Sequence, residues 1–458
     1  MTTFTFAMLL CVSTLGYLLN RQAATKLRAN GTALHSVPGY HGLYSLLSAV
    51  VPVAALIVLW LVLQGPLIDR FTMSGLPAGS LDEFDAGGRQ LILTEIKSIS
   101  RGRIFGNPEA WKVDAADRHV RTHVVAGWLL LGIVIVASLG IVGLARARVA
   151  ADFRARHGVE RITSGLMLFC STVAIFTTLG IIAALLFESI RFFVRVPITE
   201  FFFGLNWEPQ IPLRDDQIAA KGAFGWIPVF LGTLVITAVA LFLAVPVGLL
   251  SAIYLNEFAP SSLRAIAKPV LEILAGVPTV VYGFFAVLVV APAIRSFGAT
   301  LGIPVSPNAA LAAGCVMGIM LIPFISSFSD DALSAVPKSL RDGALALGAT
   351  RAETVLNVLF PAAIPGIVGG ILLAISRAIG ETMIVVMAAG LIASLTINPL
   401  DSVTTVTVQI VTLLTGDTAF DNPKTLAAFA LGMMLFVVTL VINVFALRIV
   451  RKYREAYE

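Results

Sequence analysis

Charged residues are scarce in this sequence. Only 13% of the 458 residues are Asp, Glu, Lys or Arg, whereas 57% are hydrophobic and the mean hydropathy is +0.91. Soluble globular domains contain about 25% charged residues, so the composition excludes an ordinary soluble fold and indicates an integral membrane protein. We expect the isoelectric point near 9.2 to reflect membrane topology and not nucleic-acid binding.

Cysteine and histidine are also rare. The three cysteines lie far apart in apolar segments, which predicts packing roles, and the five histidines and three cysteines show no metal-ligand spacing. The chain has no G-x-x-x-x-G-K-[ST] loop and no Gly-Lys pair, so it cannot cradle ATP phosphates itself. We therefore expect no metal site, no catalytic residue and no cofactor in this chain.

Long apolar runs make up most of the rest of the sequence. A helix needs about 20 apolar residues to cross a bilayer, and these runs are continuous and dotted with Gly and Ala, unlike the alternating strands of a barrel. The sequence therefore predicts an all-α, polytopic membrane helix bundle. The nine predicted spans are 4–19, 44–63, 123–144, 162–187, 225–250, 268–292, 309–328, 365–393 and 426–448.

Basic residues in short loops predict the orientation, since they favour the cytoplasmic side. Arg21, Lys26 and Arg28 after the first span, the arginine-rich stretch 145–161 and the C-terminal RKYREAYE all fall inside in one arrangement. Nine spans then leave the N-terminus outside and the C-terminus in the cytoplasm. The first span has no basic residue before it, which argues against a signal peptide.

The charged stretch 145–161 also marks the predicted domain boundary. We place a membrane extension at 1–158, with about three spans and an outer loop at 66–122, before a six-span domain at 159–458. The outer loop is expected either to form amphipathic helices on the membrane surface or to act as a spacer.

A polar and apolar segment, 330–361, separates two of the predicted spans. Pro337 and Ser339 are expected to open a short helix, with Asp342 completing a variant of the capping box. Gly348 is expected to end this helix with a positive φ angle.

A second short helix is predicted directly after this turn. Thr350 and Glu353 form a T-x-x-E capping box, and the helix should run to Pro361. Between the two helices, three apolar residues would form a small knob that suits a groove in a soluble partner. These residues are Ala344, Leu345 and Leu347. A surface loop without a partner is the alternative.

This segment resembles the cytoplasmic pattern of ABC-importer permeases, which is E-A-A, three residues, G, nine residues, I-x-L-P. The chain has D-G-A at 342–344, Gly348, and V-L-F-P at 358–361, so the spacing matches although four residue types differ. The resemblance implies that six residues of this segment dock against an ATPase subunit. They are Asp342, Gly343, Ala344, Leu345, Gly348 and Pro361.

Further segments over about 160–458 resemble the PstC family of phosphate permeases. They are NWEPQ followed by GWIPVFLGTL, EILAGVPTVVYGFF, LALGATRAETV and SRAIGETMIVVMAAG. The PstA family tends to have GETAP where this chain has GETM, so PstC fits better. The shorter members lack an equivalent of residues 1–158.

The resemblance implies a six-span type I importer core in the bacterial inner membrane, here preceded by about three extra spans. It implies a transport subunit and not an enzyme, which passes inorganic phosphate from a binding protein to the cytoplasm. The implied partners are a second permease like PstA, two copies of an ATPase like PstB, which uses the ATP, and a periplasmic phosphate-binding protein like PstS.

Arg377 and Glu381 lie deep in the predicted span 365–393, four residues apart, so we expect them on one helix face. An arginine at the bilayer centre costs about 2.5 to 3.5 kcal/mol on insertion scales, and such residues usually face an internal cavity. A guanidinium can grip two phosphate oxygens, and Glu381 would neutralise it in the empty state. An ion pair that only locks two helices is the alternative.

The resemblance implies a transport role for Arg377 and Glu381. Of their neighbours on the predicted substrate pathway, Gly380 is expected to allow close approach, while Ser376 and Thr382 either offer hydroxyl groups or bond back to their own helix, which we favour. Other functions stay open: an ion-coupled secondary transporter with Arg377 and Glu381 as the coupling site, an ABC permease for sulfate or molybdate, or a membrane scaffold or sensor.

Overall fold

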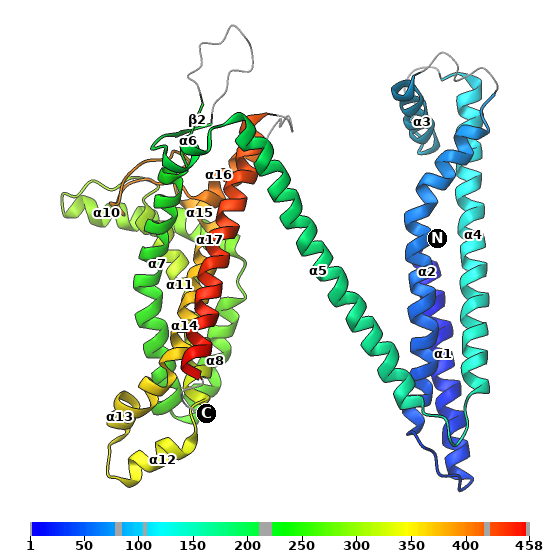
Figure 1. Ribbon diagram of the computed structural model, residues 1–458, viewed down its shortest axis with the longest axis horizontal. Coiled ribbons are helices and arrows are strands. Elements are labelled where there is room, and N and C mark those ends of the chain that lie inside the picture. The colour runs from blue at the N-terminus through cyan, green and yellow to red at the C-terminus, as the bar shows by residue number, and fades with distance from the viewer. Residues whose placement is uncertain (1, 78–84, 104–107, 210–221, 416–421, 455–458) are drawn as a thin grey trace. The chain divides into compact units, whose positions relative to one another are not determined.

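The computed structural model is helical almost throughout the part of the chain that it describes (Figure 1). The chain divides into two compact units, unit 1 (Met1–Phe176) and unit 2 (Thr177–Glu458), and helix α5 (Ala155–Arg195) contains the division. The predicted domain boundary at 158/159 also falls in α5 and stays a prediction. The described residues are 2–77, 85–103, 108–209, 222–415 and 422–454.

The prediction of an all-α membrane bundle is confirmed. Nine helices among the described residues are long and apolar enough to cross a membrane, the number that the apolar runs predict. They are Thr2–Ala29, Pro38–Ser74, Ala110–Ala147, Ala155–Arg195, Ile227–Phe258, Thr279–Thr300, Ala310–Ser334, Arg351–Ile379 and Pro423–Lys452.

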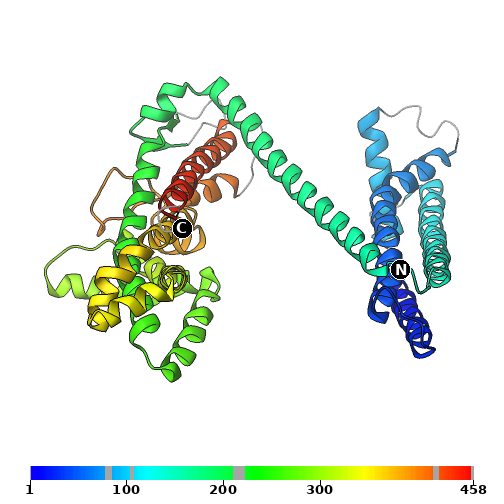
Figure 2. The same cartoon turned by 60° about the horizontal axis from the view of Figure 1, so that its bottom comes forward.

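Unit 1 is a bundle of three long helices, α1 (Thr2–Ala29), α2 (Pro38–Ser74) and α4 (Ala110–Ala147), which all pack on one another (Figure 2). A shorter helix, α3 (Ala86–Ser100), packs on α4 through Ile92 and Ile96. The predicted outer loop 66–122 therefore consists largely of helix. The bundle has a small apolar core of Leu9, Val53, Ile57, Leu130 and Val134.

Unit 2 is built around α7 (Ile227–Ile253), α11 (Ala310–Ser334) and α14 (Phe360–Ile379), with α17 (Pro423–Arg454) against α14. Glycines let α7 and α11 approach closely, as is common between membrane helices. A Cβ on Gly314 would lie 2.6 Å from a Val239 methyl, and one on Gly318 would lie 2.9 Å from the Ala240 carbonyl oxygen. Larger residues at these two positions would push the helices apart.

A short ribbon lies at the end of unit 2 remote from α12 and α13 (Figure 1). Strands β1 (Trp207–Glu208) and β2 (Ala223–Phe224) pair antiparallel after the short helix α6 (Ile198–Phe203). Aromatic side chains of this region pack edge to face in a buried cluster that includes Phe192, Phe201 and Phe224.

The predicted span 268–292 is wrong in its bounds. Helix α8 (Ser261–Ala275) ends at Gly276, and a new helix, α9 (Thr279–Phe285), begins after Pro278. Pro278 has no amide hydrogen and disfavours helical backbone at the residue before it, and Gly276 is a weak helix former, so the sequence G-V-P favours a break at this point. The span continues through a π-helical turn, η2 (Ala286–Val290), and α10 (Ala291–Thr300).

Candidate functional site

The docking segment, residues 330–361, has the two short helices and the glycine turn that the sequence predicts. Helix α12 (Lys338–Ala346) is followed by Gly348 at φ 89° and by α13 (Arg351–Thr354). The capping box is present, because Glu353 N donates to Thr350 Oγ1 at 3.3 Å and Thr350 N donates to Glu353 Oε2 at 2.8 Å.

The start of α12 differs from the prediction. Pro337 is the N-cap residue, and no side chain among the described residues caps the helix, so the predicted capping box of Ser339 and Asp342 is wrong. The φ angle of proline is fixed, here at −56°, and this value is compatible with the helix that follows.

Helix α13 continues into the membrane span without a gap. A π-helical turn, η3 (Val355–Leu359), connects it to α14, whose first turn contains Pro361. Proline cannot donate a backbone hydrogen bond, and the wider π turn lies where the regular bonding pattern changes. The predicted continuity from Thr350 to Pro361 is confirmed.

The predicted apolar knob is exposed. Leu347 is 91% exposed and Leu345 is 41% exposed, and helix α12, which the structure describes throughout, has no buried residue. A Cβ added to Gly343 or Gly348 would meet no other described atom within 4 Å. The segment therefore offers an uncovered surface with room for another chain.

One ion pair anchors α12 to the rest of unit 2. Arg341 Nη2 donates to Glu257 Oε1 in the π-helical turn η1 (Tyr254–Phe258), which follows α7. The carboxylate is largely buried, with 9% of the side chain exposed. A polar hollow of about 250 Å³ lies beside this pair and is lined by both residues together with Leu345 and Arg351.

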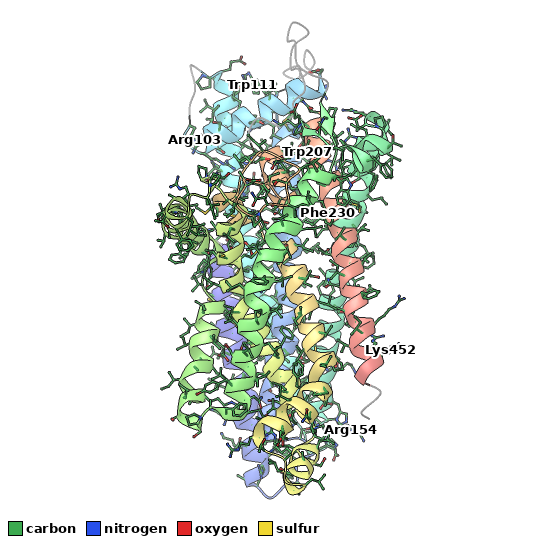
Figure 3. All side chains as sticks on the ribbon, turned by 90° about the vertical axis from the view of Figure 1, so that its left-hand side faces the viewer. Arg103, Trp111, Arg154, Trp207, Phe230 and Lys452 are labelled. Carbon is green, nitrogen blue, oxygen red and sulfur yellow. The ribbon has the colours of Figure 1, made fainter. Side chains whose placement is uncertain are left out.

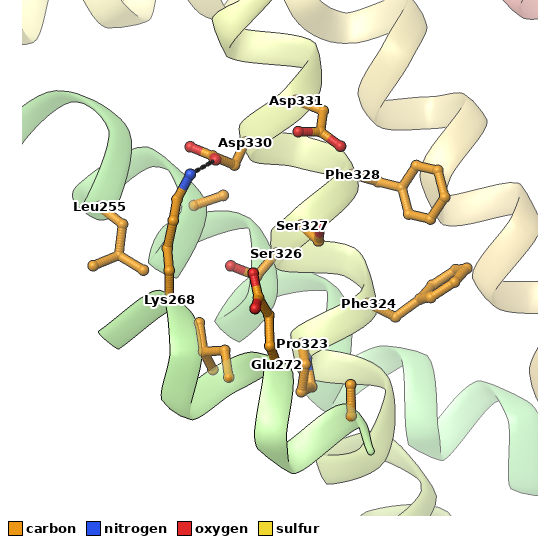
Figure 4. A pocket seen from close by; sticks show the side chains of 13 residues that line it. Leu255, Lys268, Glu272, Pro323, Phe324, Ser326, Ser327, Phe328, Asp330 and Asp331 are labelled. Atoms are coloured by element: carbon orange, nitrogen blue, oxygen red, sulfur yellow. Dashed lines mark hydrogen bonds and ion pairs between the residues drawn. The ribbon is translucent and has the colours of Figure 1, made fainter. Parts of the chain in front are cut away.

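A second anchor centres on Asp330, near the end of α11. Its side chain is buried and accepts hydrogen bonds from Asn256 Nδ2 at 2.6 Å, from Lys268 Nζ, and from Arg264 Nη2 at 3.4 Å. Figure 4 shows the Lys268–Asp330 pair at the edge of a cavity of about 350 Å³ between α8 and α11. Asp330 thus joins η1, α8 and α11 just before the docking segment continues into α12.

Sequence reasoning missed this role of Asp330. Its partners lie 62 to 74 residues earlier in the chain, so no local pattern connects them. The available signal was an acidic residue at the edge of an apolar span, which needs a partner if it is buried.

Arg377 and Glu381 do not share a helix face, so this prediction is wrong. Helix α14 ends at Ile379 with Gly380 as its C-cap, and the next helix, α15 (Met383–Ala388), begins after Thr382. Glu381 lies in the break, where its Oε1 accepts a hydrogen bond from Met383 N at 3.1 Å. The carboxylate thus satisfies one of the free amides at the start of α15.

The Arg377 side chain is exposed in this chain and stacks on an aromatic ring. Its guanidinium carbon lies 5.4 Å from the centroid of the Phe324 ring of α11. Among the ion pairs of the described residues, none joins Arg377 to Glu381. A contact with a ring face uses none of the guanidinium N–H donors, which stay available for hydrogen bonds.

The neighbours of this pair also differ from expectation in part. Ser376 Oγ donates to Asn443 Oδ1 of α17 at 2.8 Å, so the favoured bond back to its own helix is wrong. Thr382 Oγ1 does bond locally, to Gly380 O at 3.3 Å. A Cβ on Gly380 would meet only carbonyl oxygens of α14, at 3.6 Å or more, so no other described element packs on Gly380, and its role in allowing close approach stays a prediction.

A buried polar cluster next to Glu381 was not predicted. Helix α16 (Val406–Leu414) lies between the predicted spans 365–393 and 426–448, and its Thr407 Oγ1 donates to Glu381 O at 2.8 Å. Gln409 Nε2 donates to Leu391 O at 2.7 Å, while Gln409 Oε1 accepts from Trp207 Nε1 of β1 at 2.9 Å. The Thr407 hydrogen bond, helix α16 and the Gln409–Trp207 hydrogen bond therefore connect the backbone at Glu381 to the ribbon of β1 and β2.

Both units of the chain match known protein families. Residues 244–455 match the family described as a binding-protein-dependent transport system inner membrane component. Residues 6–177 match a family described as a phosphate ATP-binding cassette transporter, and these include nearly all of the predicted extension 1–158.

Individual relatives agree with the first match. A probable ABC transporter permease protein, YqgH of Bacillus subtilis, is 33% identical over 60% of this chain and 83% of its own length. The phosphate transport system permease protein PstC 1 of Mycobacterium tuberculosis is 32% identical over 57% of this chain and 83% of its own length. An inward-facing structure of the MetNI methionine ABC transporter aligns at 19% identity with a TM-score of 0.35, over 50% of this chain and 94% of that chain.

The match at 244–455 covers the docking segment and α14, whose last turn contains Arg377. This chain is a transport subunit and not an enzyme, and it belongs to the family of ABC-importer permeases that includes the PstC proteins.

Proposed function

We propose that this permease moves inorganic phosphate across a bacterial inner membrane, from a periplasmic binding protein like PstS to the cytoplasm. The names of its PstC relatives support phosphate as the substrate. One structural observation carries the mechanism: the exposed docking segment continues through α13 and η3 into α14, whose last turn contains Arg377. Motion at the docking surface can therefore reach the anion-binding side chain along one stretch of helix.

Membership of the permease family implies an ATPase and a binding protein as partners in general. We propose that two copies of a PstB-like ATPase supply ATP hydrolysis, one of them covering the knob at Leu345 and Leu347. Since Arg341 fixes α12 to η1 and Asp330 fixes η1 to α8, a push on the docking segment would move these elements together.

The proposed pathway runs past the exposed guanidinium of Arg377. A second permease like PstA would cover this face and enclose the path, since an arginine exposed to lipid costs several kcal/mol. Phosphate oxygens would accept the guanidinium N–H bonds, with Gly380 and Thr382 beside them in the break. The nearby Glu381 carboxylate would limit the net positive charge, so the anion can leave again.

The proposed orientation follows from the docking surface, because ATP is hydrolysed in the cytoplasm. The last turns of α17 lie at the same end of unit 2 as α12 and α13 (Figure 1), which supports the predicted cytoplasmic C-terminus. The predicted outside position of the N-terminus follows from nine spans and is part of the same proposal.

Co-purification tests the docking proposal. Leu347→Asp and Ala344→Glu place charges on the proposed interface, and we expect them to remove the ATPase subunit from the purified complex. Arg89→Gln in unit 1, which lies outside this surface, is the control. If the ATPase stays bound to both docking variants, the docking proposal is wrong. An ion-coupled secondary transporter would purify active without any ATPase.

Substrate competition tests the choice of anion. We expect excess unlabelled phosphate to suppress uptake of radiolabelled phosphate by the reconstituted complex, while sulfate and molybdate at equal concentration leave it unchanged. Stronger suppression by sulfate or molybdate would instead make this an ABC permease for that oxyanion.

A further inference from the structure

Unit 1 contains a large cavity, lined by both polar and apolar residues, that plays no part in the proposed transport path. Its volume is about 690 Å³, within the usual range for small-molecule sites. It lies between the end of α2, the end of α3 and the first half of α4, and it also borders the first turn of α1. The polar side chains that carry the argument are Gln64, Asp69, Lys97, Arg101, His119 and His123.

The charge of this cavity favours an anion. Lys97 Nζ forms an ion pair with Asp69 Oδ2 at 2.7 Å, which leaves the Arg101 guanidinium as the excess positive charge. Among the described residues, no ion pair occupies Arg101, and its side chain is exposed along the cavity wall. With both histidines neutral, the charged groups of the wall sum to one positive charge, which disfavours a metal cation.

The hydrogen bonds of the two histidines determine which ring nitrogens can donate, and only His123 has an N–H left for a ligand. Thr72 Oγ1 donates its proton to Ile68 O at 2.8 Å, so its contact with His119 Nδ1 at 2.9 Å requires the proton on His119. Gln64 Nε2 can only donate, so in its 3.1 Å contact His123 Nδ1 is the acceptor. The neutral His123 ring therefore carries its proton on Nε2, and this N–H is not used in the contact with Gln64.

We propose that this cavity is a binding site for a phosphate group, held by Arg101 and Lys97 with a hydrogen bond from His123. A guanidinium, an ammonium and an imidazole N–H are the donors that phosphate oxygens accept best. The group can belong to free inorganic phosphate or to the headgroup of an anionic lipid, and the experiment separates these sources.

Chemical modification of histidine tests the site in the full chain. The purified chain is placed in nanodiscs of phosphatidylcholine, treated with diethyl pyrocarbonate, and modification at each histidine is followed by mass spectrometry. His123 is exposed at the cavity, while the exposed residues His35 and His157 lie outside the cavity lining and serve as internal controls. One arm adds inorganic phosphate, with chloride at equal ionic strength as its control. The other arm replaces part of the lipid with phosphatidylglycerol.

We expect His123 to be modified several-fold more slowly in at least one arm, with His35 and His157 unchanged. Protection by inorganic phosphate identifies the free anion, and protection by phosphatidylglycerol identifies the headgroup. Arg101→Gln should raise the half-protecting concentration about tenfold or more, because it removes a charge-assisted hydrogen bond. Arg103, which Figure 3 labels, is not among the lining residues, so Arg103→Gln removes the same charge two residues away and should leave the half-protecting concentration unchanged.

Two results would overturn the proposal. Equal modification of His123 in both arms and in the chloride control would mean that no phosphate group binds there. Equal protection in the wild type and in Arg101→Gln would place the binding elsewhere. Neither result bears on the proposed transport function, which is tested separately by phosphate uptake in the variant Arg377→Gln.

Discussion

The docking segment contains two glycines whose replacement by alanine should have opposite effects. Gly348 has a φ of 89°, a conformation that costs an L-residue roughly 1 to 2 kcal/mol. Gly343 lies inside α12, where alanine is favoured over glycine by about 1 kcal/mol. Because an added Cβ would meet no described atom within 4 Å at either position, packing does not contribute and the backbone alone decides the sign.

The two variants should therefore differ by about 2 to 3 kcal/mol in the free energy that keeps α12 folded. Every 1.4 kcal/mol is a factor of ten, so amide exchange of α12 should be about 30- to 150-fold faster in Gly348→Ala than in Gly343→Ala. Hydrogen exchange measured by mass spectrometry on peptides from 338–354, with the chain in nanodiscs and no ATPase present, checks this.

The wild type should fall between the two variants. If Gly348→Ala exchanged as slowly as Gly343→Ala, the turn between α12 and α13 would not require a left-handed residue. The reasoning that derives the shape of the docking surface from its glycine turn would then fail. Equal but fast exchange in all three proteins would mean that α12 is not folded without its partner.

Three further predictions concern buried contacts, each checked by the midpoint of thermal unfolding. Asp330→Ala should lose about 1 to 3 kcal/mol of stability, because hydrogen bonds to charged groups are worth about 1.5 to 3 kcal/mol each. The loss is limited because the cationic partners of Asp330 are over a third exposed and can be hydrated. As a control, Asp331→Ala at the exposed neighbouring residue should change stability by less than about 0.5 kcal/mol. Trp207→Phe should cost about 1 to 3 kcal/mol, since the Gln409 oxygen loses its donor. Ser376→Ala should cost about 0.5 to 1.5 kcal/mol through its lost bond to α17. An unchanged midpoint in any of the three would show that the contact does not stabilise the fold.

The features that the sequence predicts well are those with local causes. The nine spans follow from composition, and the turn at Gly348 and the capping box at Thr350 follow from residues within a few positions of one another. The break after Ile379 is harder to see, because M-I-V-V-M-A-A-G continues the apolar run and only Gly380 marks the change.

Other features depend on partners distant in sequence. Asp330 is satisfied by residues of η1 and α8, and Gln409 by Trp207, which lies 202 residues earlier. Helix α16 has only nine residues, too short for a span, so a search for membrane spans does not detect it. These contacts exist only after the helices have packed, and single-sequence patterns do not contain them.

The central claim is that ATP hydrolysis by a docked subunit drives phosphate past Arg377. Uptake of radiolabelled phosphate into proteoliposomes that contain the complete complex, its binding protein and ATP tests it most directly. Uptake should require ATP. It should fall about tenfold or more in Arg377→Gln, because this variant loses a charge-assisted hydrogen bond to the anion. Arg448 is an exposed arginine of α17, and uptake in the control variant Arg448→Gln should match the wild type. Uptake that proceeds on an ion gradient without ATP, or that is unchanged in Arg377→Gln, would contradict the account.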